Sequence, residues 1–402
     1  MKHVTISTQL IATILERLTA PPDQALELFG TSAGELVHVA ALGPSWRGLP
    51  LARLAVAVAT PELSSERPTL LLANPQAPEW LDDAGPVRVS TFDLDEYSKP
   101  TRGIATAVRV QGKRVLLVGA GSIGSRVGWE LSRLGGLHVL AADRDAIEVH
   151  TPARWFGPTL PVELLVEEQK AGAWAAGAAC SCAPTTTVEG VDLDLMSDSG
   201  HAFERLVRDF KPDLMIVSTD TRDSRLLSAS LAHQAGIQAL FVGLSDGAES
   251  GMIQVQTPAT PCWLCANRDA LLSQAVPMRD RSIQYGLRSA PENETAGVPA
   301  LSANVAVTAA VASKLAVLLL AGEPWEPYFR DSAGRSGTVL AVSACSETWL
   351  FSSFLQTVVF RVEPDPACPI CGDGVQSPEQ GEQDFEFQRA QAAMASLSRL
   401  GE

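Results

Sequence analysis

The sequence of 402 residues predicts an α/β protein whose mostly parallel sheet carries helices on both faces. Three observations support this fold class. A β-branched apolar run at residues 115–118 leads directly into a turn with Gly119, Gly121 and Gly124; apolar runs alternate with amphipathic segments over residues 109–258; and polar residues end several of these runs. Strands that alternate with helices form parallel sheets, and ligands bind at the carboxyl ends of such strands. We therefore expect a site at that edge of the sheet.

The acidic composition limits the classes of partner. The chain has a formal net charge of −15, whereas a nucleic-acid-binding surface needs clustered Lys and Arg, so no nucleic-acid partner is expected. The most apolar segment, residues 301–322, contains Lys314 and several small or polar residues, and it is interpreted as a buried helix rather than a membrane span. Polar residues interrupt residues 1–18, which argues against a signal peptide. We expect a cytoplasmic protein without a membrane partner.

Residues 1–108 are expected to form a smaller amino-terminal α/β domain. Residues 3–18 are typical of a strand that enters an amphipathic helix. Further strands or short apolar elements are expected at residues 34–43, 49–59 and 68–74. This plan resembles the beginning of a JAB-type metallo-isopeptidase, but the His-x-His zinc motif of those enzymes is missing, so such a domain would be catalytically inactive. The preferred interpretation is a platform for dimer or partner contacts, joined to the rest of the chain at residues 93–103.

The glycine-rich turn predicts a Rossmann-like nucleotide site. Its glycines permit a tight turn and let a phosphate approach backbone N–H groups at the start of the next helix, which Ser122 opens; the partial positive charge there favours an anion. The next apolar run ends at Asp143, 24 residues after Gly119, where a carboxylate can accept hydrogen bonds from a ribose. Taken alone, this pattern indicates only that a nucleotide or dinucleotide binds.

The segments that follow continue the alternation of helices and strands. Residues 161–177 predict one acidic helix, and residues 211–236 predict a buried strand that ends at Ser218, Thr219 and Asp220 before another helix. Residues 237–258 predict a strand and a hairpin before the first cysteine pair. Asp220 and Asp143 are thus both expected at the carboxyl ends of strands.

Four of the seven cysteines form two C-x-x-C pairs, CWLC at 262–265 and CPIC at 368–371. Two residues between the thiolates let both bind one tetrahedral ion, and two such pairs complete a four-sulfur structural zinc site. A redox motif and coincidence are the alternatives, but both pairs follow turn-rich segments rather than a strand that enters a helix. The residues expected to bind Zn²⁺ are Cys262, Cys265, Cys368 and Cys371.

The order of these features resembles the ThiF/MoeB family of adenylating enzymes, which are related to ubiquitin-activating enzymes. In order along residues 110–372, the shared features are the glycine turn, the run Asp143, Asp145, Ile147 and Glu148, then Arg154, Lys170, Ser218 to Asp220 with Arg225, and the two cysteine pairs. A nicotinamide-dependent dehydrogenase would explain the glycines and Asp143, but it gives no reason for the other residues. The order therefore favours adenylation.

The resemblance implies ATP-dependent adenylation of the C-terminal carboxylate of a ubiquitin-like protein or a sulfur carrier. It implies that Gly121 and its neighbours hold phosphate, that Asp143 holds the ribose with Asp145 nearby, and that Arg154 and Lys170 bind the triphosphate. It implies Mg²⁺ at Asp220, a homodimer, and a conjugating enzyme as a further partner. Each residue also has an ordinary interpretation. Arg154 would be a surface turn residue, Lys170 a solvated helix charge and Asp220 a helix N-cap.

The sequence also departs from the family. Thr151 and Trp155 stand where the family usually has asparagine and glutamine, and residues 266–344 contain no cysteine. An adenylate formed here would then be released, attacked by an external nucleophile, or captured by a hydroxyl. The hydroxyls considered are those of Ser282, Ser289, Thr295 and Ser302. Two alternatives to a ubiquitin-like cargo stay open: adenylation of a short peptide or sulfur carrier in cofactor or natural-product synthesis, and a non-catalytic nucleotide-binding scaffold.

Three regions are therefore expected in the chain. Residues 1–108 form the accessory domain, residues 109–362 form the adenylation domain, and residues 363–402 complete the zinc site and end in an acidic tail.

Overall fold

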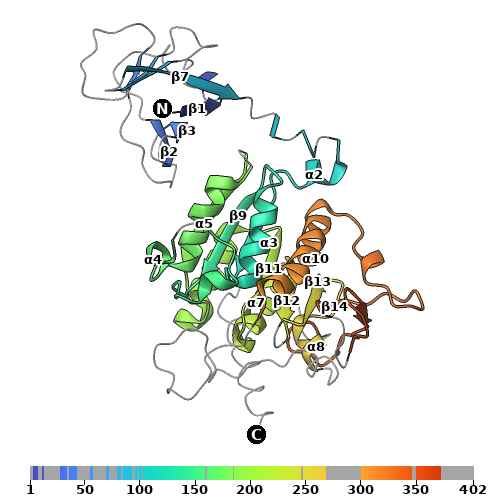
Figure 1. Cartoon of the computed structure of the whole chain (residues 1–402). Coiled ribbons are helices and arrows are strands. Elements are labelled where there is room, and N and C mark those ends of the chain that lie inside the picture. The colour runs from blue at the N-terminus through green and yellow to red at the C-terminus, as the bar shows by residue number, and fades with distance from the viewer. Residues whose placement is uncertain are drawn as a thin grey trace. The chain divides into compact units, whose positions relative to one another are not determined.

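The apolar runs of the sequence become strands of two separate sheets in the computed structural model of the chain (Figure 1). Contacts divide the chain into two units, Met1–Arg102 and Gly103–Glu402, and each is described by itself. The structure describes residues 3–7, 11–12, 28–33, 36–42, 55–57, 69–71, 79–82, 85–92, 96–97, 99–101, 103–158, 161–183, 185–245, 248–268, 300–345 and 350–372.

The first unit is built on a seven-stranded mixed sheet with the order β2-β3-β1-β7-β6-β5-β4. Strand β1 runs parallel to both of its neighbours, β3 and β7. The strands are β1 (His3–Ser7), β2 (Leu28–Ala33), β3 (Leu36–Leu42), β4 (Ala55–Ala57), β5 (Thr69–Leu71), β6 (Glu79–Asp82) and β7 (Gly85–Phe92). The sequence predicted strands or apolar elements at β1, β3, β4 and β5, and it did not predict β2, β6 and β7. Most of the helix expected within residues 3–18 lies outside the described residues.

The second unit contains an eight-stranded sheet with the order β10-β9-β8-β11-β12-β13-β14-β15. The strands are β8 (Arg114–Val118), β9 (His138–Asp143), β10 (Thr187–Asp192), β11 (Leu214–Val217), β12 (Gln238–Leu244), β13 (Ser250–Gln256), β14 (Val339–Ser343) and β15 (Thr357–Phe360). Strands β8 to β12 pair in parallel, and β13 to β15 add an antiparallel edge. The predicted mostly parallel, Rossmann-like sheet is therefore confirmed, as is the hairpin of β12 and β13.

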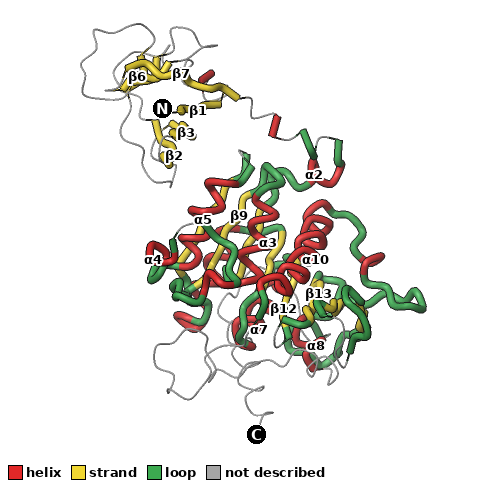
Figure 2. Tube along the Cα trace, viewed as in Figure 1, coloured by secondary structure: helices red, strands yellow, loops and turns green. Residues whose placement is uncertain are grey.

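Helices cover both faces of this sheet, as the sequence predicted (Figure 2). One face packs against α3 (Ser122–Ser132), α5 (Lys170–Ser181) and α10 (Ser302–Ala321), and the other packs against α6 (His201–Phe210), α7 (Arg222–Gln234) and α8 (Trp263–Arg268). The shorter helical segments are α2 (Ala105–Arg109), η2 (Thr151–Ala153), α4 (Val162–Leu165), η3 (Ser197–Gly200) and η4 (Glu326–Tyr328).

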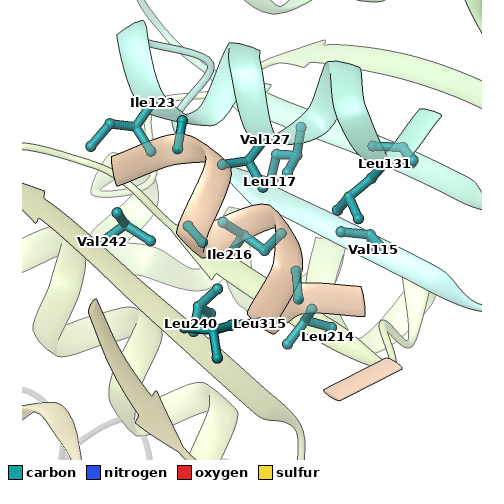
Figure 3. Close-up of a cluster of buried hydrophobic side chains, with 14 of the residues drawn as sticks. Val115, Leu117, Ile123, Val127, Leu131, Leu214, Ile216, Leu240, Val242 and Leu315 are labelled. Carbon is teal, nitrogen blue, oxygen red and sulfur yellow. The ribbon is translucent and has the colours of Figure 1, made fainter. Parts of the chain in front are cut away.

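Strand β8 contributes apolar side chains to the hydrophobic cores on both faces of the sheet. Successive side chains of a strand point to opposite faces, so Val115 and Leu117 belong to the core beneath α3 and α10, while Leu116 and Val118 belong to the other core. All four side chains are fully buried. Figure 3 shows Leu117 between the helices and the sheet. A continuous apolar run is the pattern expected for a parallel strand that is covered on both sides.

Helix α10 lies against α3 and the strands β11 to β13 (Figure 1). By length and composition alone it could cross a membrane, but half of its most apolar window is buried in the protein. Its side chains Val305, Ala312 and Leu315 belong to the core. The structure therefore gives this apolar helix a packing role, in agreement with the expectation of a buried helix.

The boundary between the two units falls earlier than the expected residue 108, because α2 belongs to the second unit. The hydroxyl of Thr106 on α2 donates a hydrogen bond of 2.6 Å to Glu323, just after α10. Arg109 forms an ion pair of 3.6 Å with the same carboxylate. These contacts join α2 to the end of α10.

The prediction of a single helix at residues 161–177 is wrong, because the structure has two helices there, α4 and α5. At the break, Glu167 has a φ of 75°, in the left-handed region that disfavours a continuing helix. The N–H of Glu167 donates to the carbonyl of Ile147, and the N–H of Ile147 donates to Glu168, both at 2.8 Å. The break therefore attaches this segment to the loop after β9.

Gly124 should be the least replaceable glycine of the turn. A Cβ at Gly124 would lie 1.9 Å from the carbonyl oxygen of Gly119, whereas a Cβ at Gly121 would meet no atom within 4 Å. We expect Gly124→Ala to lower the free energy of unfolding by about 3 kcal/mol, the upper part of the range for overpacking. Gly121→Ala, the matched control, should stay within about 0.5 kcal/mol of the parent. Urea denaturation measures both, and equal midpoints for the two variants would contradict this packing.

Candidate nucleotide site and cysteine cluster

The glycine turn lies where the order of the parallel strands reverses. Strand β8 leads through the turn into α3 and on to β9 on one side, while β11 and β12 lie on the other side of β8. In such sheets, ligands bind in the crevice outside the carboxyl ends of the two central strands. Here the hydroxyl of Ser218, which follows β11, donates a hydrogen bond of 3.0 Å to the carbonyl of Gly119, which follows β8. The two turns are therefore joined directly.

The start of α3 is open to a ligand. Gly121 is the N-cap residue of this helix and provides no side chain to satisfy the first N–H groups. Apart from Gly121 and its two chain neighbours, no described atom lies within 4 Å of the position that a Cβ of Gly121 would take. Free N–H groups beside open space at a helix N-terminus fit a phosphate group. A phosphate site at Gly119, Gly121, Ser122 and Gly124 stays a prediction, and the open start of α3 is compatible with it.

Asp143 lies at the end of β9, beside this turn. Its carboxylate accepts hydrogen bonds from the N–H of Ala120 at 2.7 Å and from the N–H of Asp145 at 2.9 Å. Burial raises the pKa of the Asp143 carboxyl, while the charge of Lys170 and these two hydrogen bonds act in the opposite direction. A carboxylate offers about four lone-pair positions, so it can accept further bonds from a ribose.

Lys170 lies with the acidic residues of this site. Its ammonium group is 2.8 Å from a carboxylate oxygen of Asp145, and only 11% of its side chain is exposed. The break between α4 and α5 produces this contact, because the N–H of Lys170 also donates to the carbonyl of Asp145 at 2.9 Å. Lys170 is therefore not a solvated helix charge.

Sequence reasoning missed Arg144. Its guanidinium group forms an ion pair of 2.9 Å with Asp194, which follows β10, and lies 3.8 Å from Asp145. Burial disfavours its charge, but the hydrogen bond to Asp194 and the charges of Asp194, Asp145 and Asp220 together raise the pKa of Arg144. The only signal in the sequence was an arginine between two aspartates, and its partner lies 50 residues further along.

Asp220 is exposed at the end of the turn after β11. The N-cap of α7 is Thr221, so Asp220 is not the helix cap that the ordinary interpretation proposed. Behind it, the buried Arg225 donates to the carbonyls of Thr219 and Val242, both at 2.7 Å. Burial lowers the pKa of Arg225 to about 10, against the charge of Asp220, so the guanidinium group stays protonated at neutral pH.

The loop that carries Arg154 is attached to the glycine turn. Arg154 itself is half-buried, and the next residue, Trp155, donates from its indole N–H to the carbonyl of Ala120 at 2.8 Å. Thr151 accepts a hydrogen bond of 3.0 Å from the N–H of Glu148 and so stabilises the turn before η2. Both departures from the family therefore have local structural roles.

The second cluster is formed by the four predicted cysteines. The distance between the sulfur atoms is 3.9 Å for Cys262 and Cys265 and 3.5 Å both for Cys262 and Cys368 and for Cys265 and Cys371. All four sulfur atoms lie within 4.8 Å of one another. A tetrahedron with Zn–S bonds of about 2.3 Å has edges of about 3.8 Å. The expectation that the fold unites the two pairs is confirmed, and the cluster has the dimensions of a zinc site.

The residues around the cluster fix both of its loops. The N–H of Asp365 points at the sulfur of Cys265 at 3.5 Å, and the side chain of Asp365 pairs with Arg268 at the end of α8. A Cβ at Gly372 would lie 2.4 Å from the carbonyl oxygen of Pro366, so the tight turn after the second pair needs glycine. Contacts of this kind orient metal ligands.

Comparison with known proteins gave one family. The sequence profile of the ThiF family matches residues 100–348. No curated protein matches the chain.

Several solved structures resemble part of the chain. MccB of E. coli with succinimide has 16% identity and a TM-score of 0.48, covering 67% of this chain and 69% of MccB. MccB of E. coli with ATP has 15% identity and a TM-score of 0.48, covering 69% of this chain and 72% of MccB. PaaA has 15% identity and a TM-score of 0.44, covering 62% of this chain and 76% of PaaA. These likenesses are partial, and the family assignment rests on the sequence profile.

The cysteine cluster should hold about one zinc ion per chain, as four thiolates bind one tetrahedral ion. Changing both Cys368 and Cys371 to serine should abolish zinc binding and lower the melting temperature, because the ion joins residues 365–372 to α8. The matched control is Cys345→Ser, which changes a half-buried thiol outside the cluster. Elemental analysis of the purified proteins measures the metal. A parent chain without zinc, or a double variant that keeps it, would refute the site.

Proposed function

The chain belongs to the ThiF family, and we propose that it uses ATP and Mg²⁺ to adenylate the C-terminal carboxylate of a peptide or small protein. One observation supports this proposal more than any other. The open position beside Gly121 at the start of α3, the carboxylate of Asp143 and the exposed carboxylate of Asp220 all lie at one edge of the sheet. This edge is where open α/β sheets bind their ligands.

The proposed reaction forms one bond and breaks another at the α-phosphorus of ATP. A carboxylate oxygen of the substrate attacks the α-phosphorus, and the bond from that phosphorus to the bridging oxygen of the β-phosphate breaks. The products are an acyl adenylate and pyrophosphate. Because two anions must meet, orientation and charge neutralisation dominate the catalysis of such a transfer.

The residues have distinct parts in this proposal. The N–H groups at the start of α3 bind phosphate, Asp143 accepts the ribose hydroxyls, and Arg154 and Lys170 neutralise the triphosphate. Asp220 would hold Mg²⁺, which would supply positive charge to the phosphates. Lys170 forms an ion pair with Asp145 in this structure, so in the proposal its ammonium group would be shared between Asp145 and the phosphates.

The sequence departures leave the proposed nucleotide site open. Trp155 stabilises the glycine turn, and Thr151 stabilises the turn before η2, so neither residue fills the space beside Gly121. This arrangement supports nucleotide binding at the start of α3, which an adenylating enzyme and a nucleotide-binding scaffold would share.

The absence of cysteine from residues 266–344 supports transfer of the adenylate to a separate nucleophile. Of the hydroxyls considered in this region, Ser282, Ser289 and Thr295 lie outside the described residues. Ser302 begins α10, and its hydroxyl oxygen accepts a hydrogen bond of 2.5 Å from Arg126. A ubiquitin-like cargo, a conjugating enzyme and a homodimer stay predictions. Short peptides and ubiquitin-like proteins share the C-terminal carboxylate that this reaction needs.

Replacement of Asp220 should separate catalysis from folding. We expect Asp220→Ala to reduce ATP–pyrophosphate exchange by about 100-fold or more, because a lost transition-state charge contact costs that much in comparable sites. The melting temperature should stay close to that of the parent, since Asp220 is exposed.

The matched control for this change is Asp209→Ala, which removes an exposed carboxylate on α6. The control should keep full exchange activity. Normal exchange in Asp220→Ala, or an equal loss in both variants, would contradict the role of Asp220.

A further inference from the structure

We propose that Trp155 is a positioning residue that orients the phosphate-binding turn toward ATP. This inference rests on the proposed use of the turn for ATP. The side chain of Trp155 is only 7% exposed, and its indole N–H donates to the carbonyl of Ala120 at 2.8 Å. Ala120 lies between Gly119 and Gly121, in the middle of the turn.

Hydrogen bonds fix the two peptide groups on either side of Ala120. Its N–H donates to Asp143 at 2.7 Å, while its carbonyl accepts from Trp155. Asp143 and Trp155 thus determine the orientation of two successive peptide planes. Gly119 and Gly121, which flank Ala120, have more backbone freedom than other residues, so these two contacts restrict the freedom that matters for binding.

The contact from Trp155 determines where the next N–H points. In a trans peptide the carbonyl and the following N–H point in opposite directions. Because the carbonyl of Ala120 points at the indole, the N–H of Gly121 points away from it. Among the described residues this N–H makes no hydrogen bond, and the space beside Gly121 is open. An outward N–H at the start of α3 is the donor that a phosphate oxygen needs.

The indole is itself held in place. A Cβ at Gly157 would lie 2.0 Å from a ring carbon of Trp155, so the backbone of Gly157 packs directly against the ring. The N–H of Phe156 donates to the hydroxyl of Ser125 on α3 at 3.1 Å. The loop that carries Arg154 is therefore joined to both the turn and the helix that follows it. Loss of the indole N–H would leave the carbonyl of Ala120 without this partner and release the peptide plane.

The consequence is specific to the phosphate end of the nucleotide. Asp143 keeps its bond to Ala120 when Trp155 changes, so contacts to the ribose should persist. We therefore expect Trp155→Phe to weaken ATP binding by about three- to ten-fold, the effect of one hydrogen bond, and to leave the affinity for adenosine unchanged. Calorimetric titration of the full-length chain with ATP and with adenosine measures both dissociation constants.

Trp174→Phe is the matched control. The indole of Trp174 is fully buried and donates at 2.9 Å to the carbonyl of Ser125, inside α3 rather than in the turn. Both Phe variants lose one buried indole N–H, so both should lose stability. Only Trp155→Phe should lose ATP affinity relative to adenosine.

A third variant distinguishes the effect of the side-chain N–H donor from the effect of the apolar volume of the ring. Trp155→Gln keeps a side-chain N–H donor but loses more apolar volume, so it should be less stable than Trp155→Phe and yet bind ATP more tightly. If ATP affinity instead follows stability, if adenosine affinity falls in parallel, or if Trp174→Phe gives the same result, the positioning role is overturned. A parent chain that binds ATP but shows no pyrophosphate exchange with any of a set of peptides and small proteins that carry a free C-terminal carboxylate would contradict the proposed function, while the binding constants would still decide the role of Trp155.

Discussion

The candidate site depends on the contact between two turns at the centre of the sheet. Strands β8 and β11 are neighbours, so the turn after β8 meets the turn after β11, and the hydroxyl of Ser218 bonds the carbonyl of Gly119 at 3.0 Å. The same carbonyl lies 1.9 Å from the position that a Cβ of Gly124 would take. A side chain at that position would separate the turn from α3. Close backbone packing therefore places the start of α3 and Asp220 at one edge.

Charge balance is the second constraint, because the proposed ligand is a polyanion and the protein is acidic. The chain has a net charge of −15, yet its candidate site gathers Arg144, Lys170 and Arg225 around its aspartates. The side chain of Lys170 is largely buried, so its charge needs the partner that Asp145 provides, whereas the ion pair of Arg144 and Asp194 is exposed. These pairs keep both signs of charge at the edge where ATP and Mg²⁺ are proposed to bind.

Local spacing was sufficient to predict the glycine turn, Asp143 and the cysteine pairs, because each depends on residues only a few positions apart or on the length of one strand–helix–strand unit. Contacts between distant segments were not predictable in this way. The break at Glu167 depends on pairing with Ile147, and the role of Trp155 depends on a carbonyl 35 residues earlier. Two of the partners of Arg144, Asp194 and Asp220, likewise follow other strands. Such pairings become visible only when the sheet order is known.

The requirement for a free carboxylate tests the central claim most directly. Pyrophosphate exchange would be measured with a set of peptides and small proteins, each with a free C-terminal carboxylate and each in a matched C-terminal amide form. The account predicts that at least one free carboxylate supports ATP-dependent exchange and that its amide supports none, because the amide lacks the nucleophilic oxygen. Equal exchange with an active substrate and its amide would contradict adenylation of the C-terminal carboxylate.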